Sequence, residues 1–75
     1  MINKVIEILA EKLDRDPSEI EATSKIKDDL GADSLDMVEI VMEIEDEFDV
    51  EVEDSDTALI ITVQDIVNYI QNKQA

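Results

Sequence analysis

The chain has 75 residues and a formal net charge of −15, and it contains neither cysteine nor histidine. A chain of this length forms one small domain that buries only about 60% of the surface of its unfolded state, so a deep catalytic pocket is not expected. The missing thiols and imidazoles exclude disulfides, zinc sites and the commonest general base. These facts argue against an enzyme, and any thiol chemistry would need a reactive group from elsewhere.

The negative charge is concentrated in the second part of the chain. Residues 1–27 carry five Lys or Arg against six Asp or Glu, whereas residues 28–72 carry fifteen acids and no base. Such a field repels nucleic acids and anionic membranes and attracts basic surfaces. No apolar run is long enough to cross a membrane, and no signal peptide is expected. The sequence therefore predicts a cytoplasmic protein, whose acids either attract basic partners or only keep it soluble.

The first predicted helix covers residues 2–13, because apolar residues recur there on one helical face. The sequence DRDPSEI then ends it, with Asp16 as a cap, Pro17 at a first helical position and Glu19 at the spacing of a capping box. An irregular connection follows through about residue 32 and contains Gly31, the one glycine of the chain. The residues of the helical face are Ile2, Val5, Ile6, Leu9 and Leu13.

Residues 34–48 are predicted to form a helix with two apolar stripes on nearly opposite sides. A surface helix needs only one such stripe. Either the helix is central and packs on both sides, or the second stripe is an exposed patch that binds a partner. The rim of carboxylates favours the exposed patch, since unpaired acids are rarely buried. The first stripe contains Met37, Val41, Ile44 and Phe48, with Ile40 at its edge, and the second contains Leu35, Val38 and Met42.

Ser34 lies at the predicted start of this helix, between two aspartates. Asp33 and Asp36 have the spacing of a capping box, so Asp33 is expected to be the N-cap and Ser34 the first helical residue, with its hydroxyl free. Acidic neighbours make a poor setting for a catalytic alkoxide. From the residues alone, Ser34 is either part of the local capping or a point where a group is attached.

The segment that follows this helix has an ambiguous pattern. DVEVE alternates like a strand and ALIITV is a short β-branched run, which together are compatible with a hairpin. Residues 54–60 are equally compatible with a short helical turn. The sequence TVQD at residues 62–65 resembles a capping box and predicts a last helix over about residues 63–72.

The segment Asp29–Val52, DLGADSLDMVEIVMEIEDEFDVEV, resembles the central part of acyl carrier proteins. The hallmark of that family is an Asp-Ser-Leu attachment site, which corresponds here to Asp33–Leu35. The similarity continues in ITVQDIVNYI, residues 61–70, whereas residues 1–28 share the helical pattern more than the identities.

The resemblance implies a carrier and not an enzyme, with 4′-phosphopantetheine attached through a phosphodiester to Ser34. The arm would supply the thiol that the chain lacks and hold acyl groups as thioesters during fatty acid biosynthesis. The transferase that attaches the arm would bring its own metal, so no specific metal site is expected. Basic surfaces of this transferase, of fatty-acid-synthesis enzymes and of acyltransferases would bind a recognition face. That face comprises Asp33, Leu35, Asp36, Val38, Glu39, Met42, Glu45, Asp46 and Asp54.

The fold that the resemblance implies is all-α, a single monomeric domain over residues 1–75 that forms a small four-helix bundle with a short third helix. This favours a helix over a hairpin at residues 54–60. The acyl chain would be sheltered between the second and third helices, by residues that are equally consistent with plain core. Glu53 replaces a proline that many relatives have, and Leu59 and Ile61 are apolar where polar residues are common. The residues expected to shelter the acyl chain are Ile26, Ile40, Ile44, Val52, Ile60 and Tyr69.

Three other functions are each compatible with part of the sequence. A carrier for polyketide or peptide assembly would share the attachment site, but the GADSLD sequence and the acidity of residues 34–54 favour the fatty-acid type. An acidic adaptor without a prosthetic group would explain the charge but neither Ser34 nor the second stripe. Asp54 and Asp56 suggest a calcium module, but no EF-hand spacing supports one.

Overall fold

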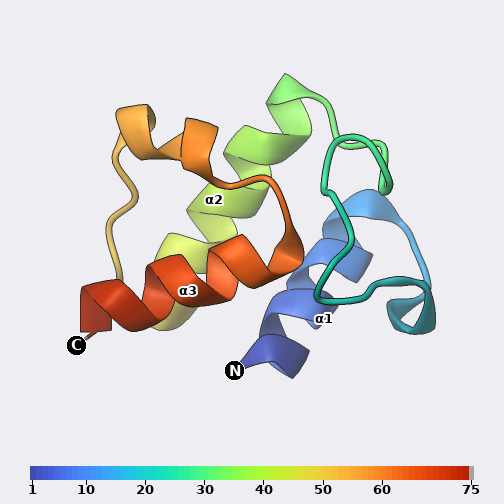
Figure 1. Ribbon diagram of the computed structural model, residues 1–75, viewed down its shortest axis with the longest axis horizontal. Helices are drawn as coiled ribbons and strands as arrows, with labels where there is room; N and C mark the ends of the chain where they lie inside the picture. Colours follow the sequence, from blue (N-terminus) through green and yellow to red (C-terminus); the bar gives the residue numbers. More distant parts are fainter. Residues whose placement is uncertain (75) are drawn as a thin grey trace.

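The computed structural model describes residues 1–74, which form three α-helices and two short 3₁₀ helices. The α-helices are α1 (Ile2–Leu13), α2 (Ser34–Phe48) and α3 (Val63–Gln74), and the 3₁₀ helices are η1 (Pro17–Glu19) and η2 (Asp54–Leu59). In Figure 1, η2 lies near the N-terminal half of α2, at the end of the molecule away from both termini. The all-helical prediction is confirmed, and η2 is the short third helix of the bundle.

The three α-helices enclose one hydrophobic core. The helix α1 contacts both α2 and α3, and each helix contributes a side chain with no exposed surface, namely Leu9, Ile40 and Ile70. Ile26, from the long connection before α2, is equally buried. Full burial of an aliphatic side chain contributes about 1.5–3 kcal/mol, so these residues hold the bundle together.

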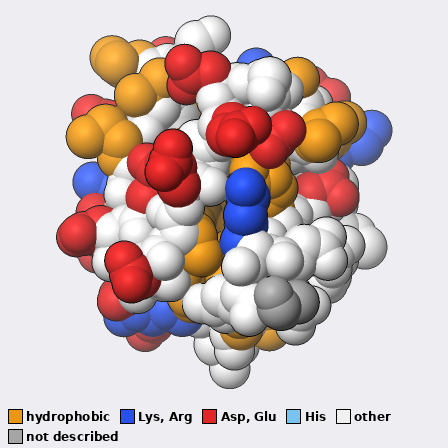
Figure 2. All heavy atoms as spheres, turned by 90° about the vertical axis from the view of Figure 1, so that its left-hand side faces the viewer, with side chains coloured by type: hydrophobic (Ala, Val, Ile, Leu, Met, Phe, Trp, Pro, Cys, Tyr) orange, Lys and Arg blue, Asp and Glu red, His pale blue; other side chains and the backbone are white. Residues whose placement is uncertain are grey.

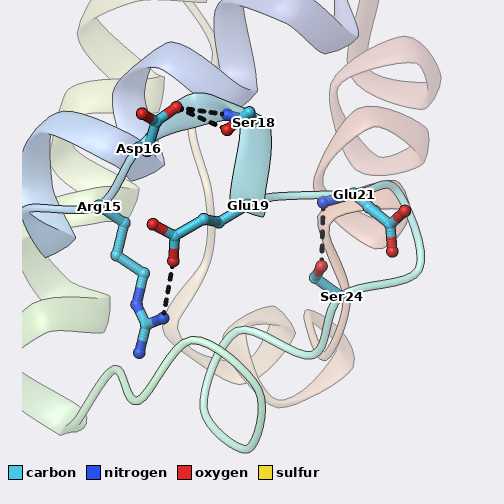
Figure 3. A network of polar contacts seen from close by, with 6 residues as sticks. All are labelled: Arg15, Asp16, Ser18, Glu19, Glu21 and Ser24. Atoms are coloured by element: carbon cyan, nitrogen blue, oxygen red, sulfur yellow. Dashed lines mark hydrogen bonds and ion pairs between the residues drawn. The ribbon is translucent and has the colours of Figure 1, made fainter.

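The first part of the connection is stabilised by local polar contacts (Figure 3). Asp16 caps η1 as predicted: its Oδ1 accepts hydrogen bonds from the Ser18 backbone N–H at 2.9 Å and from the Ser18 hydroxyl at 2.8 Å. The bond from the backbone N–H is the main reason why the pKa of Asp16 is lowered. Glu19 has capping-box spacing but forms an ion pair with Arg15 at 3.5 Å, so that part of the prediction is wrong.

The second part of the connection runs along the segment that leads into α3. The Ile26 backbone N–H donates to the Ile61 carbonyl oxygen at 2.9 Å, and Lys25 forms an isolated antiparallel bridge with Thr62. Since the Ile26 side chain is fully buried beside these contacts, this part of the connection has a fixed position next to η2.

Residues 49–62 form η2 and irregular chain, and no strand occurs in them or elsewhere in residues 1–74. The hairpin alternative is therefore excluded. The Val52 backbone N–H donates to Glu45 Oε2 at 2.8 Å, and the Tyr69 hydroxyl donates to Asp56 Oδ2 at 2.6 Å. This second bond ties η2 to α3 and raises the pKa of Tyr69.

Glu53 has a φ of −74°, which proline also adopts, so the backbone there is compatible with the proline of relatives.

The start of α3 has the capping box that the sequence predicted. Asp65 Oδ2 accepts from the backbone N–H groups of Thr62 at 2.9 Å and Ile61 at 3.1 Å, and the Asp65 N–H donates to the Thr62 hydroxyl at 3.2 Å. The bond from the Thr62 N–H is the largest cause of the lowered pKa of Asp65, while partial burial opposes the shift. The helix extends two residues beyond the predicted end, to Gln74.

Replacing the charged cap by its neutral isostere, Asp65→Asn, is expected to lower the free energy of unfolding by about 1 kcal/mol at neutral pH, because hydrogen bonds to charged groups are the stronger ones. The folded-state pKa of Asp65 is lowered, so its stabilisation is complete above the ordinary carboxyl pKa and is lost as the pH falls through the folded value. Urea unfolding of both proteins from neutral pH to about pH 2 tests this. A stability difference that stays constant over this range contradicts it.

Candidate functional site

The start of α2 is fixed by reciprocal hydrogen bonds between Asp33 and Asp36. The Asp36 backbone N–H donates to Asp33 Oδ1 at 2.8 Å, and the Asp33 backbone N–H donates to Asp36 Oδ2 at 3.1 Å. This is the predicted capping box, with Asp33 as N-cap. Gly31 lets the chain turn into it, since its φ of +76° lies in the left-handed region that favours glycine. Caps of this kind contribute about 1 kcal/mol.

Ser34 is the first residue of α2, and its side chain is exposed. Within residues 1–74, its hydroxyl takes part in no hydrogen bond, because the two aspartates beside it make the capping bonds instead. Neither carboxylate forms a hydrogen bond with the hydroxyl, so neither is placed as a general base for it. The arrangement offers a reachable oxygen atom on a fixed helix end, without the groups that would make it a catalytic nucleophile.

The second apolar stripe of α2 is exposed. Leu35, Val38 and Met42 have exposed fractions of 68%, 54% and 61%. The opposite stripe, with Met37 and Ile44, faces the core. A central helix packed on both sides is therefore excluded, and α2 presents an apolar strip that begins next to Ser34.

The predicted recognition acids fall into two groups. Glu45 is half-buried and uses its carboxylate to hold the Val52 N–H, and Asp33 and Asp36 are used in capping. Glu39 and Asp46 are exposed, and no ion pair involves them within residues 1–74. They line a shallow hollow of about 350 Å³ together with Lys12, Met42 and Glu43.

Neighbouring acids of α2 are instead paired with α1. Lys4 Nζ lies 3.0 Å from Glu47 Oε1, and Lys12 Nζ lies 3.9 Å from Glu43 Oε2. The hydrogen bond with Glu47 raises the pKa of Lys4. These pairs neutralise two acids of α2, whereas Glu39 and Asp46 form no ion pair within residues 1–74.

Acidic side chains are scattered widely over the surface. Figure 2 views the molecule from the left-hand side of Figure 1, where η2 and the C-terminal end of α3 lie. On this face, acidic side chains lie next to hydrophobic ones. Asp54, the remaining predicted recognition acid, is exposed on η2. Within the part of the chain that the structure describes, no three acids converge as metal ligands would, and no helix is long and apolar enough to cross a bilayer.

A cleft of about 410 Å³ opens between the first turn of α2, η2 and the connection. Of the predicted acyl-chain residues, only Ile60 lines it. Ile26, Ile40, Ile44 and Val52 are buried in the core cluster, and Tyr69 packs half-buried against it. The lining consists of Lys25, Lys27, Asp28, Met37, Asp54, Thr57, Ala58, Ile60 and Ile61.

Sequence reasoning missed most of these lining residues. For Ile61, the available signal in the sequence is an apolar residue where polar residues are common in the family, directly after Ile60. No periodic pattern marks Lys25 and Lys27, which reach the cleft through the contact between the connection and the segment before α3.

Comparisons with known proteins agree with this arrangement. The family model described as "Phosphopantetheine attachment site" matches residues 3–70. An acyl carrier protein of Exiguobacterium sp. (strain ATCC BAA-1283 / AT1b) is 54% identical over 69 residues, which cover 92% of this chain and 87% of that protein. Both findings confirm the resemblance inferred from the sequence. The chain thus belongs to the phosphopantetheine-attachment family of acyl carrier proteins, which carry 4′-phosphopantetheine and are not enzymes.

Proposed function

We propose that the chain carries acyl intermediates of fatty acid biosynthesis as thioesters on a 4′-phosphopantetheine arm attached to Ser34. The observation that supports this proposal is the position of Ser34, which is exposed at the start of α2. Its hydroxyl makes no hydrogen bond within residues 1–74. The arm supplies the thiol that a chain without cysteine lacks. The arrangement suits this group, because Ser34 is exposed and the cleft begins one helical turn away, at Met37.

The residues around Ser34 present it and do no chemistry themselves. Asp33 and Asp36 keep the helix end formed, which holds the hydroxyl in one place relative to the exposed stripe. A transferase that docks on α2 therefore finds its target oxygen at a fixed distance, and preorganisation of this kind lowers the entropic cost of docking.

The docking face that we propose combines the exposed stripe of α2 with its carboxylates. Leu35, Val38 and Met42 provide apolar contact, while Glu39 and Asp46 attract basic enzyme surfaces over a longer range, because neither is neutralised by an ion pair within residues 1–74. Long-range attraction of this type acts mainly on the association rate. The other members of the face are Asp33, Asp36, Glu45 and Asp54.

The acyl chain is proposed to enter the cleft between α2 and η2 and to extend toward the core behind it. Ile60 belongs to both the cleft and the core cluster, so it connects the two. Behind it, the predicted lining residues form the part of the core that would have to open. They are Ile26, Ile40, Ile44, Val52 and Tyr69.

A carrier for polyketide or peptide assembly is the nearest alternative, and the acidic character of residues 34–54 favours the fatty-acid type. The proposal also includes that residues 1–75 form a single carrier domain, which is monomeric and located in the cytoplasm. Its partners are enzymes, and it neither binds nucleic acid nor inserts stably into a membrane. The family match counts against an acidic adaptor without a prosthetic group, and the loading experiment below tests that alternative directly.

Loading by a phosphopantetheinyl transferase tests the attachment site. After incubation with coenzyme A, we expect the wild type and the Ser55→Ala control to gain the mass of one phosphopantetheine, and Ser34→Ala to gain none. The far-ultraviolet circular dichroism of Ser34→Ala should match the wild type, because the Ser34 hydroxyl makes no bond that holds the fold. Loading of folded Ser34→Ala, or no loading of the wild type by an active transferase, contradicts the proposal.

Charge reversal tests the docking face. The double variant Glu39→Lys/Asp46→Lys should associate with the transferase at a rate lower by on the order of tenfold at low salt, with little change in the dissociation rate. The matched control is Glu11→Lys/Glu21→Lys, which has the same net charge and changes exposed acids that do not belong to α2. Stopped-flow kinetics measures both. If the control slows association as much, net charge alone is responsible and α2 is not the docking face.

A further inference from the structure

Two lysines of the cleft have no ionic partner. Within residues 1–74, no carboxylate oxygen lies within 4.0 Å of the amino group of Lys25 or Lys27. Lys4, Lys12 and Arg15, by contrast, are each paired with an acid. In a chain with a net charge of −15, two unpaired bases in one concave surface are available to an anionic ligand.

The segment that carries the two lysines is held in place. Lys25 and Lys27 flank the fully buried Ile26, whose backbone is bonded to Ile61 across the cleft wall. The Lys25 backbone N–H also donates to Asp29 Oδ2 at 2.8 Å. The backbone at both lysines is therefore fixed beside the cleft, while their side chains are exposed.

Four of the other seven residues that line the cleft are apolar. Met37, Ala58, Ile60 and Ile61 contribute hydrocarbon surface, and the volume of about 410 Å³ is typical of sites for small molecules. An apolar group with an anionic end would use both parts of this lining. A wholly apolar group would leave the ammonium groups without a partner.

Acids also line the cleft and bear on the sign of its charge. Asp28 and Asp54 are among the lining residues, so two acids balance the two lysines there, in contrast to the strongly negative chain as a whole. Asp54 belongs to η2, whereas both lysines and Asp28 belong to the connection. The connection side of the cleft therefore carries two bases against one acid, so a carboxylate would be bound there and repelled from the side of Asp54.

The cleft lies within reach of a group on Ser34. Met37, in its lining, follows Ser34 by three residues on α2, and side chains at this spacing are about 5–6 Å apart on a helix. A flexible arm attached to Ser34 can therefore fold back into the cleft.

We propose that Lys25 and Lys27 bind the carboxylate at the far end of an acyl group carried on Ser34. The cleft thereby distinguishes acyl groups that end in a carboxylate from those that end in a methyl group. The proposal rests on the proposed function, because the acyl group reaches the cleft only if Ser34 bears the arm.

The test compares loaded forms of the isotope-labelled protein by two-dimensional amide NMR. A transferase loads the chain with the arm alone, with an acyl group that ends in a carboxylate, or with its methyl-ended counterpart of the same length, and intact mass verifies each form. We expect the carboxylate form to shift the amide signals of residues 25–28 and 60–61 relative to the methyl form. This difference should vanish in Lys25→Gln/Lys27→Gln and persist in the control Lys73→Gln. It should grow in Asp54→Asn, which removes the opposing charge.

Three results would overturn the proposal. Identical spectra of the carboxylate and methyl forms mean that the lysines do not recognise the end of the acyl group. Shifts that appear in full with the arm alone mean that the lysines bind its phosphodiester instead. A difference that survives Lys25→Gln/Lys27→Gln means that other groups cause it. A chain that gains no mass at Ser34 overturns the proposed function as well, whereas a loaded chain with unresponsive lysines overturns this inference alone.

Discussion

The reciprocal hydrogen bonds between Asp33 and Asp36 are the contacts on which the proposed function most depends. They define where α2 begins and so leave Ser34 at its first position. Each residue along a helix is rotated by about 100° from the last, so the apolar spacing within α2 then decides which side chains face the core. With the observed start, Met37 and Ile44 are buried, Val38 is exposed, and the Ser34 hydroxyl is left unbonded within residues 1–74.

Many of the acids that make the chain so negative also stabilise its backbone. Asp65 holds the start of α3, Glu45 holds the turn after α2, and Asp29 accepts the Lys25 N–H. Carboxylates that accept backbone N–H groups satisfy donors that would otherwise be left without partners at helix ends and turns. The acidity therefore has two roles: some carboxylates hold the fold, and others, such as Glu39 and Asp46, remain available to partners.

Features set by local sequence could be predicted, and features set by distant contacts could not. The extent of α2, its capping box and its exposed stripe follow from spacing along one helix. The choice between hairpin and helix at residues 54–60 depends on contacts such as that of Tyr69 with Asp56, thirteen residues apart, so local pattern left it open. Ile8 lies outside the predicted stripe of α1 but is buried, since α1 packs against two helices. Lys25 lines the cleft because the connection pairs with the segment before α3, which no local pattern indicates.

The central claim is that the prosthetic group is attached to Ser34, at the end of α2, and to no other hydroxyl. The most direct measurement is fragmentation mass spectrometry of the unmutated chain after loading, which assigns the added mass to a residue. We expect the phosphopantetheine on Ser34 alone. An added mass on any other serine or threonine, such as Ser24 or Ser55, would contradict the account, because the capping box would then not be what presents the attachment site.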